Sequence, residues 1–199
     1  MTDLGPLLDT MIARIEAVRS PMESRIERAL RSVPRHEYVP PVALVVGNDR
    51  PPLLIDRDAD PELWLRHVYT ETALVTQLDD GATELRDLDG SYSSSSSAPA
   101  TVADLLELLD PRPGDRVLEI GTGTGWTAAL LCHLAGEPNV TSVEVDPSIC
   151  GWSCCRTAPR GAGSASMPPT CPCGRSGLST CRTRKRCGRG KAPRAWTPA

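Results

Sequence analysis

The last fifty residues of this chain lack the residue types from which buried strands are usually built. Residues 150–199 contain no Val, Ile, Phe, Tyr, Asp, Glu, Asn, Gln or His, and are rich in Arg, Gly, Pro, Cys, Ser, Thr and Ala. Six prolines and seven glycines interrupt every stretch of this segment. Such a composition buries too little apolar area to offset the entropy lost on ordering. We therefore expect residues 150–199 to be a disordered, basic tail rich in Cys, Arg, Pro and Gly.

Charge and cysteine divide the chain at the same place. Residues 1–149 hold all 25 acidic residues and 12 of the 22 basic ones, a formal balance of −13. The tail holds the other 10 basic residues and no acidic one, a balance of +10, so the overall −3 describes neither part. Cys132 is the single cysteine before residue 150. One cysteine in a segment of this length is typical of a reduced, intracellular protein.

Signals for export and membrane insertion are also missing from the sequence. Met1–Leu4 shows neither the basic nor the apolar region of a secretory signal peptide. No apolar run approaches the roughly 20 residues that a membrane-spanning helix needs. We expect a soluble, cytoplasmic protein that does not enter a membrane.

Residues 1–90 are predicted to form an N-terminal helical region on the substrate side of the molecule. Apolar residues recur at helical spacing from Leu4 to Val18. A second helix is predicted to open at Ser20, which could cap it, with Glu23 completing a capping box. Pro34 is expected to stop this helix.

Two segments have the composition of loops or linkers. Residues 47–61 contain Gly, Asn, Pro and several Asp and are interpreted as a loop. Between them, Trp64 to Leu78 carries six candidates for burial: Trp64, Leu65, Val68, Tyr69, Leu74 and Val75. The serine run Ser91–Ser97 could be a flexible linker, but it leads directly into an apolar helical pattern that begins after Pro99.

A βαβ pattern is predicted within residues 91–149. Arg116–Ile120 is typical of a short buried strand, Trp126–Ala135 of a helix, and Val140–Val145 of a second strand. Strand, helix and strand in this order favour a parallel sheet with a right-handed crossover. The predicted fold class is α/β: an incomplete Rossmann-like core with N-terminal helices before it and the tail after it.

A glycine-rich loop joins the first strand of this unit to its helix. Glycine at 121, 123 and 125 lets the backbone turn tightly and approach a ligand closely. The helix N-terminus behind the loop favours a negatively charged group, such as a carboxylate. Glu144 lies 19 residues beyond Gly125 at the end of the next strand, where its carboxylate can accept both ribose hydroxyls of a nucleoside. The candidate cofactor-binding residues are Glu119, Gly121, Thr122, Gly123, Thr124, Gly125 and Glu144.

The details of the loop favour S-adenosyl-L-methionine over a dinucleotide. The glycine spacing is G-x-G-x-G, and Glu119 precedes it by two residues. A carboxylate at that position suits a ligand with a sulfonium and an ammonium, whereas it would repel a pyrophosphate. A dinucleotide-binding dehydrogenase remains the alternative ligand class. The structural alternative is a tight strand–helix turn without a ligand, with Glu144 as a solvated strand end.

Three segments in order resemble the protein-L-isoaspartate O-methyltransferases, a family of class I S-adenosylmethionine-dependent enzymes. They are Val33–Pro40, Ser97–Pro99 and the loop that follows Glu119, and Trp126 replaces the family's usual tyrosine. The resemblance implies an O-methyltransferase that acts on a side-chain carboxylate of a protein or peptide. It also implies that the Ser97 hydroxyl lies near the acceptor carboxylate, which makes Ser97 the candidate catalytic residue.

A narrower resemblance concerns bacterial relatives that accompany ATP-grasp ligases in ribosomal-peptide maturation. It rests on Trp64–Tyr69, Val75–Gly81 and Ser94–Ser97. It implies a peptide substrate with a modified acidic residue, and an ATP-grasp peptide ligase system as partner, in place of an isoaspartyl protein. Both resemblances are expected to end at Ile149.

Several other residues have competing interpretations. Ser97 is also a suitable N-cap for the helix after Pro99. Arg35 and His36 could contact substrate, but a partly buried structural Arg and a surface His are the preferred interpretations. A carboxylate nucleophile needs no strong general base, because alignment of oxygen, methyl and sulfur supplies most of the catalysis.

The tail allows three hypotheses. Its cysteines, with the spacing C-x-C-x7-C-x5-C from Cys171, do not follow a usual zinc pattern, so no metal site is expected. The basic run Arg182–Arg186 lacks an aromatic platform, so nucleic-acid binding is not expected, although the tail could be a basic interaction module. Its composition is typical of GC-rich DNA translated out of frame. A frameshift near codon 150 would make this chain a truncated, inactive remnant.

Overall fold

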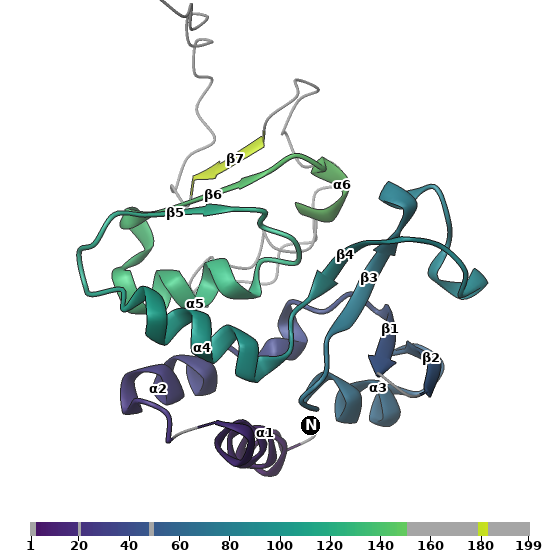
Figure 1. Cartoon of the computed structure of the whole chain (residues 1–199), viewed down its shortest axis with the longest axis horizontal. Coiled ribbons are helices and arrows are strands. Elements are labelled where there is room, and N and C mark those ends of the chain that lie inside the picture. The colour runs from purple at the N-terminus through teal and green to yellow at the C-terminus, as the bar shows by residue number, and fades with distance from the viewer. Residues whose placement is uncertain (1–2, 20, 48–49, 151–178, 183–199) are drawn as a thin grey trace, which may run out of the picture.

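The structure, a computed structural model, describes residues 3–19, 21–47, 50–150 and 179–182. These residues form helices packed against two separate sheets (Figure 1). The α-helices are α1 (Gly5–Val18), α2 (Ser24–Ser32), α3 (Pro61–Val68), α4 (Pro99–Leu109), α5 (Trp126–Ala135) and α6 (Pro147–Cys150). The strands are β1 (Val42–Gly47), β2 (Arg50–Asp56), β3 (Leu74–Leu78), β4 (Tyr92–Ser96), β5 (Val117–Ile120), β6 (Val140–Glu144) and β7 (Ser179–Arg182). Short 3-10 turns are η1 (Arg35–Glu37), η2 (Asp79–Gly81), η3 (Leu85–Asp87) and η4 (Glu137–Asn139).

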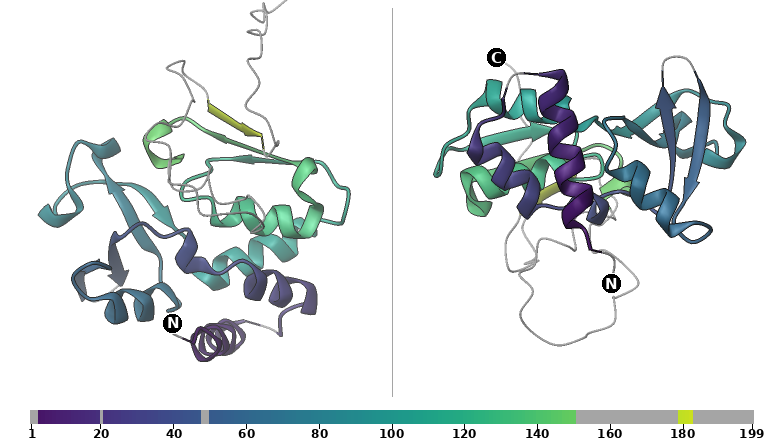
Figure 2. Two further views of the ribbon diagram at one scale, coloured as in Figure 1. Left: turned by 180° about the vertical axis from the view of Figure 1, so that it is seen from behind. Right: turned by 90° about the horizontal axis from the view of Figure 1, so that it is seen from below.

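The N-terminal helices lie across helices from the second half of the described chain. The predicted helix of Leu4–Val18 is confirmed as α1, whose apolar stripe is buried. Helix α1 packs on α4, and α2 packs on both α4 and α5. The view from below shows α1 at the front, with the antiparallel sheet beside it (Figure 2). One apolar cluster therefore contains buried residues of α1, α2, α4 and α5, and so joins the start of the chain to the helices before and after β5.

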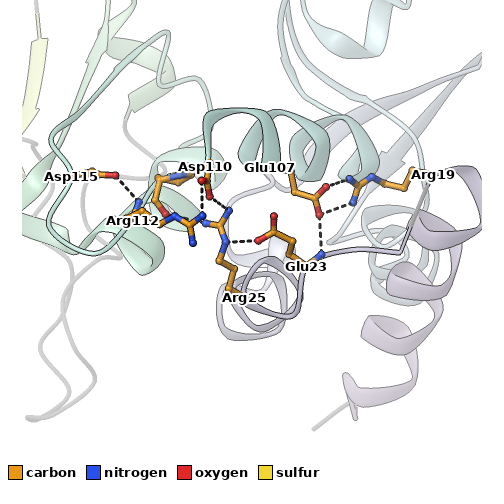
Figure 3. Close-up of polar contacts among 8 residues, drawn as sticks. Arg19, Glu23, Arg25, Glu107, Asp110, Arg112 and Asp115 are labelled. Atoms are coloured by element: carbon orange, nitrogen blue, oxygen red, sulfur yellow. Dashed lines mark hydrogen bonds and ion pairs between the residues drawn. The ribbon is translucent and has the colours of Figure 1, made fainter.

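A network of charged side chains connects α4 to the segment between α1 and α2 (Figure 3). Arg19 pairs with Asp104 and Glu107, and Glu107 also accepts a hydrogen bond from the Glu23 backbone N–H at 2.9 Å. Arg25 reaches the end of the same helix through the Asp110 carboxylate at 2.5 Å. Glu107 thus holds the start of α2, where the sequence predicted a capping box.

The predicted start of α2 is therefore corrected. The helix begins at Ser24 with Glu23 as its N-cap, and Glu23 makes no capping hydrogen bond with its own side chain. The predicted capping box cannot form, because the helix begins at Ser24, four residues after Ser20. Ser20 itself lies outside the described residues. The orphan N–H at this end is satisfied by Glu107, a residue more than eighty positions away.

An antiparallel sheet of order β2-β1-β3-β4 occupies the region that the sequence predicted to be helical. The loop predicted for residues 47–61 is wrong over residues 50–56, which form β2. Proline is tolerated there because β2 is an edge strand and pairs only with β1 among the described strands. The linker predicted for Ser91–Ser97 is likewise wrong, because Tyr92–Ser96 form β4 beside β3. Five of the predicted buried residues are buried: Trp64, Val68, Tyr69, Leu74 and Val75.

The second sheet has the order β5-β6-β7 and contains the predicted βαβ unit. Strands β5 and β6 are parallel, with Val117 opposite Val140 and Ile120 opposite Val143. Helices α4 and α5 lie on one side of this sheet (Figure 1). On the other face, Leu118 and Ile120 are 63% and 84% exposed, because no described element covers them. The strand that the sequence predicted to be buried is therefore covered on one face only.

The tail departs from its prediction at one place. Ser179–Arg182 form β7, which pairs antiparallel with β6, although residues 150–199 were expected to contribute no strand. An edge of β6 offers free backbone groups to any extended segment, and the backbone of β7 uses them. The rest of the predicted disordered tail, residues 151–178 and 183–199, lies outside the described residues. Among the described helices, none is long and apolar enough to cross a bilayer.

Candidate functional site

The glycine loop closes over the end of strand β6. The backbone N–H groups of Gly121 and Thr122 both donate to the carbonyl oxygen of Val143, at 2.8 and 3.2 Å. The Gly125 N–H then turns back to the carbonyl oxygen of Thr122 at 2.9 Å. These bonds hold the loop between the carboxyl ends of β5 and β6, the edge where open α/β sheets bind ligands.

Two features of the glycines favour ligand approach. Gly121, Gly123 and Gly125 have φ values of 88°, 53° and 87°, in the left-handed region that favours glycine. A Cβ placed on Gly121 or Gly123 would meet no atom within 4 Å. Among the described residues, the space into which a side chain would project from these two glycines is therefore open, and a ligand could approach their backbone closely.

A hydroxyl relay fixes the Glu119 carboxylate beneath the loop. The Ser142 hydroxyl donates to Glu119 Oε2, and the Thr122 and Ser142 hydroxyls are hydrogen-bonded to each other. Both hydroxyl residues are buried. Burial raises the pKa of Glu119 to about 7, against the opposing effect of the Ser142 hydrogen bond, and the nearby Glu144 carboxylate raises it further. A cationic ligand beside Glu119 would stabilise its charged form.

The Glu144 carboxylate, at the end of β6, accepts a hydrogen bond from the glycine loop. Its Oε2 accepts a hydrogen bond from the Gly123 N–H at 2.8 Å, and its Oε1 accepts from the backbone N–H groups of Val145 and Asp146 at 2.8 and 3.1 Å. It is buried, so the solvated strand end considered from the sequence is wrong. A carboxylate offers about four acceptor positions. Three are used by backbone N–H groups, so ribose hydroxyls would share or replace these bonds.

Sequence reasoning missed two groups at this site. Ser142 stands directly opposite Glu119 in the parallel register of β5 and β6, a neighbour that the predicted βαβ unit would have identified. Gln77 donates to Asp146 Oδ2 at 2.7 Å and accepts from the Ser93 hydroxyl at 2.9 Å. Gln77 thereby links the antiparallel sheet to the end of β6, and no local sequence pattern indicates that contact.

Ser97 lies at the end of β4, exposed, directly before α4. Its alternative interpretation as a helix cap is wrong, because the N-cap is Ala98 and makes no side-chain capping bond. The Glu71 carboxylate takes that role and accepts a hydrogen bond from the Ala100 N–H at 2.8 Å. The Ser97 hydroxyl is consequently not committed to capping, and an acceptor group could use it.

Arg35 and His36 occupy different environments. Arg35 is fully buried, more than the partly buried position expected, and it donates to the carbonyl oxygen of Ser97 at 2.8 Å. His36 is half-buried, and its Nδ1 is hydrogen-bonded to the Tyr69 hydroxyl at 2.8 Å. The hydrogen bonds of Arg35 to backbone agree with its structural interpretation, whereas His36 is less exposed than the surface position expected.

The residues present fit a cationic nucleoside cofactor. The space beside Gly121 and Gly123 is open to a ligand. The Glu119 carboxylate, whose pKa burial raises to about 7, favours a ligand that carries positive charge near it. No group of three or more metal-ligating side chains occurs among the described residues. Of the four tail cysteines considered for zinc, Cys171, Cys173 and Cys187 lie outside the described residues. A hollow of about 570 Å³ near Leu7, Arg57 and Trp64 contains none of the predicted site residues.

A parallel βαβ unit, a G-x-G-x-G loop and acidic residues on both strands define a class I methyltransferase-like α/β core. Residues 66–177 match the family described as protein-L-isoaspartate(D-aspartate) O-methyltransferase, and the chain belongs to this family. The family's enzymes use S-adenosyl-L-methionine as methyl donor. The match extends beyond Ile149, where the resemblance was expected to end, so that expected boundary is corrected.

Individual relatives carry the same family name. The chain is 30% identical over 129 residues to protein-L-isoaspartate O-methyltransferase 2 of Archaeoglobus fulgidus, covering 64% of this chain and 43% of the relative. It is 34% identical over 138 residues to the enzyme of Methanoregula boonei, covering 69% and 45%. A solved protein-L-isoaspartate O-methyltransferase aligns with a TM-score of 0.48 and 28% identity, over 72% of this chain and 35% of that one. The chain thus spans about half the length of the relatives it matches.

Proposed function

We propose that this chain carries the cofactor-binding front part of an S-adenosylmethionine-dependent O-methyltransferase acting on a side-chain carboxylate of a protein or peptide. The observation that carries the proposal is Glu119, a buried carboxylate held by a hydroxyl relay beside an open glycine loop. Such a carboxylate suits the ammonium and sulfonium of this cofactor and would oppose the pyrophosphate of a dinucleotide.

When bound, S-adenosylmethionine supplies an activated methyl group on a sulfonium. Gly121 and Gly123 allow close backbone approach, Glu119 holds the cationic end, and Glu144 offers oxygens to ribose hydroxyls. The Ser97 hydroxyl orients the acceptor carboxylate by donating a hydrogen bond to it. The acceptor oxygen is already an anion, so the protein contributes alignment and exclusion of water and needs no general base.

Calorimetry with S-adenosylmethionine and NAD tests the cofactor class. We expect binding of the first and none of the second. Gly121→Ala should weaken binding at least about tenfold, because its Cβ would occupy the open approach and strain a backbone at φ 88°. Gly47→Ala is the matched control, since its Cβ also meets nothing within 4 Å but its φ lies outside the left-handed range. Binding of NAD alone would contradict the proposal.

The acceptor is proposed to be an isoaspartyl residue, and a modified acidic residue of a peptide processed with an ATP-grasp ligase is the second candidate. The family match and the relatives' names favour the first. Each peptide would be incubated with labelled methyl donor and the protein restored to full length by correction of the reading frame, with Ser97→Ala as the comparison variant. Transfer to neither peptide, together with transfer to a small metabolite or a nucleic acid, would refute both candidates.

We also propose that the protein acts in the cytoplasm and that the chain as written has little activity. The single cysteine before residue 150 supports the first point. The composition after residue 149 supports the second, through a frameshift near codon 150. The DNA decides the origin of the tail: a one-base shift that opens a frame rich in Val, Ile, Leu and acidic residues would support it, and early stops in every other frame would refute it.

A non-enzymatic role is the second candidate function for this chain. It is favoured by the tail's ten basic residues without one acidic residue. Retention of the full chain on heparin, lost when Arg182–Arg186 are neutralised, would support a basic interaction module. Elution at the same salt concentration for both chains would count against it.

A further inference from the structure

A fully buried arginine lies between the two halves of the proposed site. Arg35 has no exposed surface, and among the described residues its printed hydrogen bonds run to backbone carbonyl oxygens and to the Ser96 hydroxyl. Burial lowers the pKa of Arg35 to about 10, and the fields of Glu71 and Tyr69 oppose this effect. The guanidinium therefore stays charged at neutral pH inside the protein. Its charge must be balanced by dipoles, since an unpaired buried cation is otherwise very costly.

Those dipoles are backbone carbonyl groups from two separate segments. The terminal nitrogens of Arg35 donate to the oxygens of Val68 (2.9 Å), Thr70 (3.4 Å), Thr72 (3.2 Å), Ser96 (3.2 Å) and Ser97 (2.8 Å). The first three belong to the connection between α3 and β3, and the last two end β4. The two terminal nitrogens carry four N–H hydrogens in a fixed fork, so at least one hydrogen is shared between two of these five oxygens.

The same guanidinium also lies over an aromatic ring at the start of α5. Its central carbon lies 5.2 Å from the ring centroid of Trp126, the first residue of α5. The Trp126 indole N–H in turn donates to the carbonyl oxygen of Val33, two residues before Arg35, at 3.0 Å. Trp126 follows Gly125 directly, so the ring anchors the end of the glycine loop. One side chain thus contacts both the strand end that presents Ser97 and the helix start that completes the loop.

We propose that Arg35 is a positioning residue that sets the acceptor side, at Ser97, against the cofactor loop, at Gly125–Trp126. It touches neither substrate nor cofactor and acts through backbone carbonyls on one side and an indole ring on the other. Lysine would preserve the charge but not the fork or the flat surface that stacks on Trp126. The consequence for methyl transfer rests on the proposed function, whereas the placement of the two segments does not.

Amide hydrogen exchange tests the placement without any ligand. In Arg35→Lys, exchange at Ser96 and Ala100 and at Gly125 and Ala129 should speed up by on the order of tenfold, relative to amides of α1 in the same protein. Acceleration at both places supports the proposal. Acceleration confined to one of them, or a uniform increase that follows global stability, would overturn it.

Two further variants keep this test decisive. Arg57→Lys is the matched control, because Arg57 also stacks on an indole ring, that of Trp64, at 5.6 Å. The Arg57 side chain is 40% exposed, so this substitution should leave the exchange rates of all four amides unchanged. If Arg35→Lys fails to fold, Trp126→Phe removes the indole N–H bond to Val33 and shrinks the ring that stacks on Arg35. It should speed exchange at Ser96, on the far side of Arg35, and unchanged exchange there would overturn the proposal.

Peptide affinity then tests the functional consequence in the full chain. Ser97→Ala should weaken binding of an isoaspartyl peptide, measured with S-adenosylhomocysteine present, and this loss should largely disappear in the Arg35→Lys background. An equal loss in both backgrounds would mean that Arg35 does not act through Ser97. If the wild-type chain binds neither cofactor nor peptide, the proposed function fails, and hydrogen exchange alone still decides the placement.

Discussion

The two sheets of this protein are supported to different degrees. In the antiparallel sheet, β1 and β3 are paired on both edges, and Ala43, Leu44, Leu74 and Val75 are buried on both faces. In the sheet that carries the glycine loop, β5 pairs only with β6 among the described strands, and its side chains alternate between half-buried and exposed. The two central strands of the antiparallel sheet are thus covered on both faces. The sheet that carries the glycine loop is covered by helices on one face only.

This difference indicates where stability and function are separated. The cofactor strand β5 is four residues long, and its inner face meets α5 while its outer face holds Leu118 and Ile120 in solvent. Apolar side chains stabilise the fold only in proportion to the area that they remove from water. The inner layer must therefore hold the glycine loop in place, and the three predictions below test that layer, the site above it and its border with the N-terminal helices.

The largest effect is expected from truncation of the inner layer. Leu130→Ala in α5 removes a fully buried side chain and leaves a cavity in the main apolar cluster, so it should cost about 2–5 kcal/mol of unfolding free energy. Ile120→Ala on the outer face of the same sheet should change it by less than about 0.5 kcal/mol, because that side chain is 84% exposed. Urea denaturation of both variants measures the contrast. Equal losses would show that the outer face is also covered.

A second, smaller effect should come from Glu119. Its pKa is about 7 in the folded protein, above its ordinary value near 4.3, so the folded state binds the proton more tightly. Stability contributed by this group must therefore fall as pH rises between these two values and stay low above pH 7. Glu119→Gln should remove this fall and stabilise the protein at pH 8 by roughly 3 kcal/mol, because each unit of pKa shift corresponds to about 1.4 kcal/mol.

Thermal unfolding at pH 5 and pH 8 would measure this effect. The two chains should differ little at pH 5 and separate at pH 8, while cofactor binding by the variant should weaken because the carboxylate is gone. A variant that is no more stable than wild type at pH 8 would contradict the raised pKa.

The smallest effect concerns the border between α4 and the N-terminal helices. The hydrogen bond from Arg19 holds the pKa of Glu107 below its ordinary range, which burial only partly opposes. This contribution is present above the unfolded pKa and is lost as pH falls through the lowered one. Glu107→Gln should cost about 1 kcal/mol at pH 7, and the difference should vanish in acid.

Glu27→Gln is the control for this border. Glu27 pairs with Arg31 one helical turn away, where both side chains are more than a third exposed, so its loss should cost no more than about 0.5 kcal/mol. If the two variants lost the same stability at pH 7, the contacts of Glu107 with Arg19 and the Glu23 N–H would contribute nothing beyond an ordinary surface pair.

The βαβ unit was predictable because its elements are defined by neighbours in the chain. Helix α5 covers the predicted residues Trp126–Ala135, and β6 ends one residue before the predicted strand. The close agreement follows from alternating burial in short strands and from a glycine at each end of the helix, Gly125 and Gly136, both with positive φ. Local chemistry decides such boundaries.

The antiparallel sheet was not predictable, because its strands depend on distant partners. Ser94 and Ser96 lie in a strand, although a serine run is typical of a linker, because Thr76 donates to one hydroxyl and Arg35 bonds the other residue. Composition shows that these residues are polar, but it does not show which groups form hydrogen bonds with them. The same reason hid the hydroxyl relay at Glu119, where the partner Ser142 is 23 residues away.

The distance along the chain between α1, α2 and the helices that cover them has a consequence during synthesis. Arg19 meets its partners 85 and 88 residues later, and Val33 meets Trp126 93 residues later. At the usual rate of about 5–20 residues per second, a ribosome takes roughly 5 to 20 seconds to supply that much chain. Throughout that interval the apolar faces of the first two helices have no permanent covering, which is the condition in which nascent chains bind chaperones or one another.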